Sequence, residues 1–293
     1  MILSSTARAA DRLAQIGPAL LGASSFACGD VLSKVVLRHG ADVLTMSMVR
    51  GVIGVVLLFA WLQLLPPRPP FAPRARAISF GLGVLFAGNV MLLFTAIALV
   101  EVPIAILTYF VYPLLTGLAA AATGLEKISW RGALAAVVAF LGLALMIGAH
   151  PGSLAAMGIL AALGAAGCRV VMLLVTRAAL QGADALQITW YSMMSSTAVL
   201  VAATLAAQDW QPPVDAPGWT ALLAFSAAVT AGILGVFAST VRIGPFRTAL
   251  FMNLEPLLAT IGSALFLGEV VTPLQALGGA VMIAALMAFQ LRR

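Results

Sequence analysis

The chain has 293 residues, of which 62% are hydrophobic and only 9% are charged, and its mean hydropathy is +1.08. A soluble domain usually carries about 25% charged residues, so this composition excludes an ordinary soluble protein and indicates one that lies in a lipid bilayer. The 16 Lys and Arg outnumber the 10 Asp and Glu, but they stand at the ends of apolar runs. This placement predicts membrane orientation and no nucleic-acid partner.

Ten apolar runs follow one another along the chain, each about 17–25 residues long, which is the length that crosses a bilayer. We place them near 16–37, 43–65, 78–99, 102–122, 131–149, 154–176, 186–206, 218–241, 247–267 and 274–290. Proline-rich and glycine-rich turns separate them, such as Pro66–Pro70 and His150–Ser153. We therefore expect an all-α integral membrane protein with ten transmembrane helices.

The two halves of the chain repeat each other at an offset of 143 residues. The matched positions are Lys34 and Arg177, Pro113 and Pro256, and Glu126 and Glu269. The turn Gly40-Ala41-Asp42 also matches Gly182-Ala183-Asp184, one residue out of register. A fixed offset over so much of the chain predicts a duplication, with residues 1–150 as the first five-helix repeat and 151–293 as the second.

The basic residues predict the orientation of the helices. With a cytoplasmic N-terminus, the outer side holds Lys34 and Arg38. The inner side then holds Arg8, Arg12, Arg68, Arg74, Arg76, Lys127, Arg131, Arg177, Arg242, Arg247, Arg292 and Arg293. Twelve against two satisfies the positive-inside rule and places both termini in the cytoplasm. Because five is odd, the second repeat is inverted, as in secondary transporters that alternate access around a central cavity.

The two proline-centred helices each end near a Gly/Glu turn, Gly124-Leu125-Glu126 in the first half and Gly268-Glu269 in the second. With ten short helices in two halves, this pattern resembles the drug/metabolite transporter superfamily, and within it the bacterial EamA-type exporters, including those of aromatic amino acids. The resemblance implies a basket of helices around a cavity, with the fifth and tenth helices peripheral. It also implies export of a small metabolite across the bacterial inner membrane.

Ionisable side chains inside a bilayer are costly and usually face a cavity or a partner. Four stand out: Asp30, Arg50, Arg169 and Glu255. Similar depths suggest two couples, Asp30 with Arg50 and Arg169 with Glu255. These couples act either as gates and substrate contacts or as static interhelical pairs, and both interpretations stay open. Lys34 is expected to extend to the outer interface.

Further candidates for the cavity wall are aromatic and amide side chains within the helices. They are Asn89, Tyr109, Tyr112, Trp190, Tyr191 and Asn253. Tyr109 and Tyr112 share a helical face and need hydrogen-bond partners at their depth, so we expect them at a cavity. Trp190 and Tyr191 also fit the interfacial aromatic belt. The side-chain amides of Asn89 and Asn253 could equally form hydrogen bonds between helices instead of lining a cavity.

Pro113 and Pro256 each remove a backbone hydrogen bond and free a carbonyl one turn earlier. Freed carbonyls are tolerated at this depth only beside protein or a wet cavity. A packing kink is the simpler interpretation, but two matched kinks in inverted halves favour hinges.

A membrane enzyme is the rival class of function, and it needs a nucleophile with its base or a metal cluster. His39 and His150 have no ligand spacing, so we expect no enzyme, no metal and no cofactor. Nearly balanced buried charges favour a zwitterion, and apolar walls favour an apolar side chain. We therefore expect a monomeric secondary transporter that exports amino acids, with other small metabolites or drugs as the alternative cargo.

Overall fold

The computed structural model describes residues 2–66, 68–148, 156–208 and 210–291, and in these ranges every regular element is a helix. The turn expected at His150–Ser153 lies outside the described residues. The helices are α1 (Ile2–Arg38), α2 (Val43–Leu64), α3 (Pro73–Leu99), α4 (Val102–Tyr109), α5 (Tyr112–Ala122), α6 (Trp130–Ile147), α7 (Ala156–Ala179), α8 (Ala185–Ala207), α9 (Ala216–Ile243), α10 (Pro245–Met252), α11 (Leu254–Leu267) and α12 (Pro273–Leu291).

Aspartates begin three of these helices, because a carboxylate satisfies the free N–H groups of a first turn. Asp42 accepts hydrogen bonds from the N–H groups of Leu44 and Thr45, at 2.7 and 3.0 Å. Its match in the second half, Asp184, does the same at the start of α8. Asp215 accepts from Gly218 N, and this bond, together with one from His39, holds the pKa of Asp215 below its usual value.

In the described residues, nine of the ten expected spans are found at full length, and the tenth is shorter. Nine segments are long and apolar enough to span a bilayer, and Pro273–Ala288 is a shorter apolar helix. The expected spans 102–122 and 247–267 are each broken in two, into α4 with α5 and α10 with α11. The first helix also begins well before residue 16. The protein is thus an all-helical, multi-pass membrane protein.

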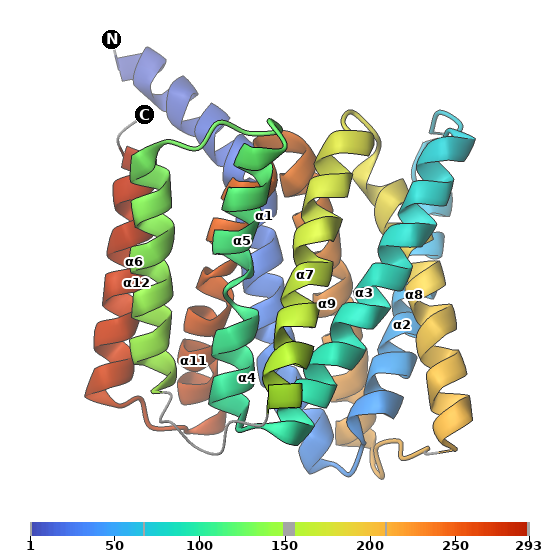
Figure 1. Ribbon diagram of the computed structural model, residues 1–293. Helices are drawn as coiled ribbons and strands as arrows, with labels where there is room; N and C mark the ends of the chain where they lie inside the picture. The colour runs from blue at the N-terminus through green and yellow to red at the C-terminus, as the bar shows by residue number, and fades with distance from the viewer. Residues whose placement is uncertain (1, 67, 149–155, 209, 292–293) are drawn as a thin grey trace.

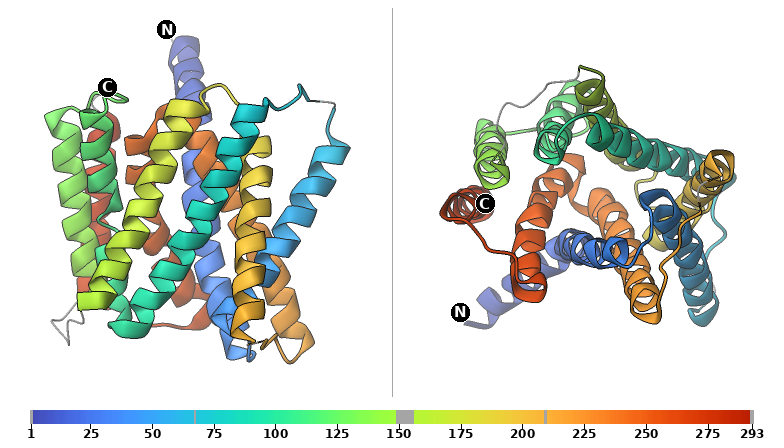
Figure 2. Two further views of the ribbon diagram at one scale, coloured as in Figure 1. Left: turned by 45° about the vertical axis from the view of Figure 1, so that its right-hand side comes forward. Right: turned by 90° about the horizontal axis from the view of Figure 1, so that it is seen from below.

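The second half has the inverted topology of the first. Helix α1 begins at the end of the molecule where α12 finishes, whereas its counterpart α7 begins at the opposite end (Figure 1). We call these the terminal end and the far end. Seen from below, α6 and α12 form a separate pair beside the other helices, which surround the interior (Figure 2). The crossings expected to be peripheral are therefore peripheral.

Small residues let the paired helices α6 and α12 approach each other closely. At the crossing of α6 and α12, a Cβ added to Gly142 would lie 2.8 Å from the carbonyl oxygen of Gly278. Lipid does not drive helices together as water does, so such close backbone packing is a main source of their association.

Candidate functional site

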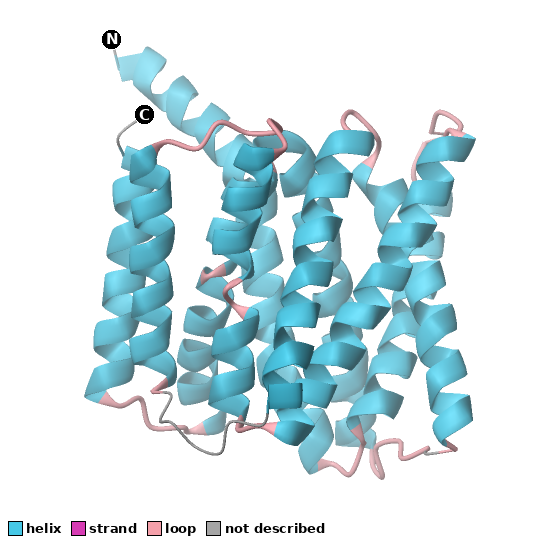
Figure 3. Ribbon diagram, viewed as in Figure 1, coloured by secondary structure: helices cyan, strands magenta, loops and turns pink. Residues whose placement is uncertain are grey.

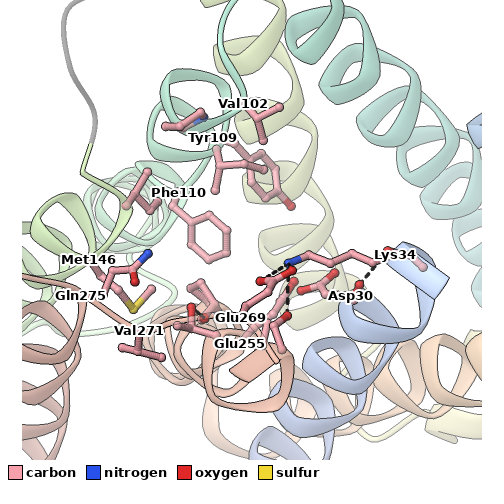
Figure 4. Close-up of a pocket in the computed structure, with 18 of the residues that line it drawn as sticks. Asp30, Lys34, Val102, Tyr109, Phe110, Met146, Glu255, Glu269, Val271 and Gln275 are labelled. Atoms are coloured by element: carbon pink, nitrogen blue, oxygen red, sulfur yellow. Dashed lines mark hydrogen bonds and ion pairs between the residues drawn. The ribbon is translucent and has the colours of Figure 1, made fainter. Parts of the chain in front are cut away.

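A cavity of about 590 Å³ opens at the far end, between the last turns of α1 and α6, the first turns of α4 and α12, and the body of α11. Figure 4 shows its side chains. The polar lining residues are Asp30, Ser33, Lys34, Tyr109, Glu255, Thr260, Ser263, Glu269 and Gln275. Apolar side chains, including Leu93, Ile106, Phe110, Met146 and Val271, form the remaining wall. A cavity of this size fits a molecule as large as an amino acid.

An ion pair joins α1 to the end of α11 at the mouth of this cavity. Lys34 Nζ lies 2.8 Å from Glu269 Oε2 and 3.2 Å from Ser263 Oγ (Figure 4). The hydrogen bond from Lys34 lowers the pKa of the Glu269 carboxyl. The pair therefore persists at neutral and mildly acidic pH, and is lost only as pH falls below the ordinary glutamate range. Both side chains are more than 40% exposed, so the pair borders the opening without sealing it.

Two more carboxyl groups, Asp30 and Glu255, lie deeper in the same cavity (Figure 4). They are close enough to interact electrostatically, and Glu255 also feels the charge of Arg169. Among the ionisable lining residues there are thus three carboxyl groups and one ammonium. Such a cavity attracts a ligand that carries a cationic group.

The broken helices place Glu255 in this cavity. Figure 3 shows the two breaks as short loop segments midway along their crossings. The first separates Tyr109 from Tyr112, and the second lies at Asn253, so that Glu255 stands in the first turn of α11. Broken helices are tolerated in a membrane where they line a cavity, and they supply polar groups at its centre.

Neither of the two expected charge couples is a direct ion pair in the described part of the chain. No ion pair within 4 Å joins Asp30 to Arg50 or Arg169 to Glu255 in the described chain. The Arg50 guanidinium lies 5.6 Å from the ring centre of Phe86 and 5.9 Å from that of Phe225. Aromatic faces attract cations, so two rings stand where a carboxylate was expected.

Arg169 is also buried between aromatic rings, 5.6 Å from the centre of Phe26 and 5.8 Å from that of Tyr112. It interacts electrostatically with Tyr109 and Glu255, which line the cavity. Its Nε has no hydrogen-bond partner among the described atoms. Arg169 therefore stands behind the deep end of the cavity with unused donor capacity.

Four of the predicted site residues line the cavity: Asp30, Tyr109, Glu255 and Pro256. Tyr112 and Asn253 are buried at the two helix breaks, and Pro113 lies in the first turn of α5, all three behind the wall. Asn89 donates to the carbonyl of Ala165 at 2.7 Å, which makes it an interhelical link between α3 and α7.

Trp190 and Tyr191 lie outside this cavity, in an aromatic cluster near the terminal end. Tyr191 stacks on Phe71 at 5.4 Å, and Trp190 lies 6.0 Å from Phe59. The Arg76 guanidinium lies 5.4 Å from the Tyr191 ring centre. This environment agrees better with an interfacial aromatic belt than with a cavity wall.

Lys34 and Glu269 also belong to the site, although the sequence predicts only that Lys34 reaches the interface and that Glu269 repeats Glu126. Their pairing depends on a contact between residues 235 positions apart, which no local pattern reveals.

Polar contacts join the helices at the terminal end, where a smaller hollow of about 340 Å³ lies beside Arg68 and Asp184. Arg68 pairs with Asp184, and Arg177 donates to the carbonyl of Val241 at 2.5 Å. Glu126 accepts from the backbone N–H of Phe246 at 3.1 Å. The larger cavity, of about 590 Å³, opens at the far end.

A family model matches the chain twice, over residues 16–148 and 156–289, under the description EamA-like transporter family. The chain belongs to this family. A solved structure titled "Crystal structure of protein" is similar to the EamA-like chain, with a TM-score of 0.79 and 17% identity, over 95% of this chain and all of the other. At this identity the likeness shows a shared fold alone. No curated protein matches the sequence.

Proposed function

We propose that this EamA-like transporter exports amino acids, with apolar and aromatic ones favoured, by alternating access. The observation that carries the proposal is the composition of the far-end cavity, in which Asp30 and Glu255 lie deep beside an apolar wall. A substrate ammonium would bind at these two carboxyl groups, and an apolar side chain would lie against Ile106 and Phe110.

The substrate carboxylate would face a cation. Lys34 stands at the mouth of the cavity, and Arg169 lies behind Tyr109 and Glu255 with an unpaired Nε. Removing a charged group from water is costly unless an opposite charge receives it. A cavity with both a cation and carboxyl groups within reach of one ligand therefore supports a zwitterion.

The proposed orientation is that of an inner-membrane protein with cytoplasmic termini. The connections at the terminal end carry Arg68, Lys127, Arg242 and other basic residues, which is the bias of cytoplasmic loops (Figure 1). In this orientation the cavity opens to the outside, and the structure is the outward-open state of the cycle.

A second cargo class, small amines or cationic drugs, is favoured by one specific observation. Carboxyl groups outnumber the ammonium three to one among the ionisable lining residues. A purely cationic ligand would use Asp30 and Glu255 without needing Arg169 or Lys34.

The direct test is counterflow in liposomes loaded with unlabelled amino acid, with a panel of labelled amino acids and their decarboxylated amines outside. We expect accumulation of phenylalanine or leucine that exceeds accumulation of the matching amines. Faster counterflow of the amines would replace the proposal with amine export. Equal, background-level signals for the whole panel would reject both cargo classes.

A further inference from the structure

Two glutamates occupy matched positions at opposite ends of the molecule. Glu126 follows α5 at the terminal end, and Glu269 follows α11 at the far end, 143 residues later. Around Glu126 the molecule is closed locally, because α5 and α10 pack against each other, whereas beside Glu269 their counterparts α11 and α4 face each other across the open cavity. The same feature, a glutamate that follows the second helix of a broken crossing, can thus be compared where the helices are packed together and where they are apart.

At the closed end, Glu126 binds the start of α10. Its Oε2 accepts from Phe246 N at 3.1 Å, and its Oε1 lies 3.8 Å from Arg247 Nε. Gly244, with a φ of +92°, brings the backbone so near that an added Cβ would lie 2.8 Å from Oε2. A carboxylate at the first turn of a helix is stabilised by the free N–H groups and by the helix dipole.

This contact holds Phe246 against α5. The Phe246 side chain is 3% exposed, and a Cβ added to Gly117 would lie 2.9 Å from its ring. Thr116 beside it is fully buried. The repeat offset carries the open-cavity residues Ala259 and Thr260 onto Thr116 and Gly117. Phe246 therefore covers the surface that corresponds to the open wall at the far end.

At the open end, Glu269 pairs with Lys34, and it faces Val102, in the first turn of α4, across the cavity. Helix α4 corresponds to α10, but Pro103 stands at the position of Phe246 and has no N–H. The N–H groups of Ile104 and Ala105 donate to the carbonyl of Glu101, so Val102 N is the free donor at this helix start. The acceptor and the unsatisfied helix start are both present, but the cavity separates them.

We propose that Glu126 and Glu269 are reciprocal latches. Glu126 binds the start of α10 and holds the terminal end closed in the state seen here. In the opposite state Glu269 binds the start of α4 and holds the far end closed, while Glu126 is released. Both are positioning residues, because they act through the ends of the broken helices. The inference rests on the alternating access of the proposed function but not on the identity of the cargo.

The test measures which end is open, with single cysteines in a background where Cys28 and Cys168 are replaced. Thr116→Cys reports the terminal end, and its match Ala259→Cys reports the far end. Each is labelled with a membrane-impermeant thiol reagent, in inside-out and right-side-out vesicles. The quantity compared is the ratio of the two labelling rates, terminal over far.

In Glu126→Ala we expect this ratio to rise roughly tenfold, the size of effect when one charge-assisted hydrogen bond is removed from one of two states. Glu269→Ala should move the ratio in the opposite direction, because the ion pair with Lys34 that it also removes is exposed and contributes little. Glu126→Gln and Glu269→Gln keep an acceptor oxygen and should give smaller changes of the same sign. Arg74→Ala is the control, because Arg74 is an exposed charged side chain in the first turn of α3, outside the cavity lining and away from α4 and α10, and it should leave the ratio unchanged.

Shifts of the same sign in the Glu126 and Glu269 variants, or shifts no larger than in Arg74→Ala, overturn the latches. If an alanine variant does not fold, the corresponding glutamine variant decides the sign. Opposite shifts without amino-acid counterflow would support the latches and reject the cargo. Amino-acid counterflow without these shifts would support the cargo and reject the latches.

Discussion

At the scale of single residues, contacts between helices are set by backbone approach as much as by side chains. Helices α3 and α8 cross at Gly83, where Ser192 and Ser195 donate to the carbonyls of Ser79 and Phe80 at 2.9 and 2.7 Å. A Cβ on Gly83 would overlap the carbonyl oxygen of Ser192 and the hydroxyl of Ser195. The two serine bonds form only because this position has no side chain.

Gly83→Ala is therefore expected to destabilise the protein by about 1–3 kcal/mol, the usual cost of overpacking. Gly81, on the same helix and two residues away, has open space around it, and Gly81→Ala should be neutral or stabilising by up to about 1 kcal/mol. Thermal unfolding of both variants in the same detergent measures the difference. Equal unfolding midpoints for the two variants would show that the crossing of α3 and α8 can accept a Cβ at position 83, which contradicts the structure.

At the scale of elements, the two broken crossings are the parts that can move. Pro113 stands in the first turn of α5, and Pro256 is the third residue of α11, each just after a break. The short helices α4 and α10 can then change direction relative to α5 and α11 without breaking a continuous hydrogen-bond ladder. A hinge at these breaks would let the latches exchange.

Pro113→Ala and Pro256→Ala should slow transport about five- to tenfold, which corresponds to about 1–1.4 kcal/mol in the barrier, while insertion and stability stay near wild type. Pro73→Ala is the matched control, because Pro73 begins α3 away from either break. Initial rates in liposomes, at equal protein amounts, measure the effect. Wild-type rates for both hinge variants would leave the prolines as packing features.

At the scale of the whole molecule, the helix count, the inverted halves and the peripheral α6–α12 pair follow from sequence patterns that are local or periodic. Hydropathy marks each span, and a constant offset reveals the duplication. The partners of buried charges do not follow, because they depend on which side chains meet across helices. Arg50 illustrates this, since the sequence offers Asp30 at similar depth but the packing provides Phe86 and Phe225.

Some residues of the cavity can be predicted from the sequence, but their arrangement around it cannot. The cost of burying a charge identified Asp30 and Glu255 as functional candidates. That both face one cavity, together with Lys34 and Glu269, depends on the packing of α1 against α11. Trp190 and Tyr191 were less predictable, because an aromatic pair near a helix start serves an interface and a cavity equally well.

The central claim is that Asp30 and Glu255 bind the ammonium of the transported molecule. It is tested most directly by the concentration dependence of initial amino-acid uptake for Asp30→Asn and Glu255→Gln, with Glu101→Gln as the control carboxyl outside the cavity. Loss of a buried charge-assisted bond costs about 1.5–3 kcal/mol, so each cavity variant should raise the half-saturating concentration at least tenfold. Wild-type concentration dependence in both cavity variants would contradict the claim.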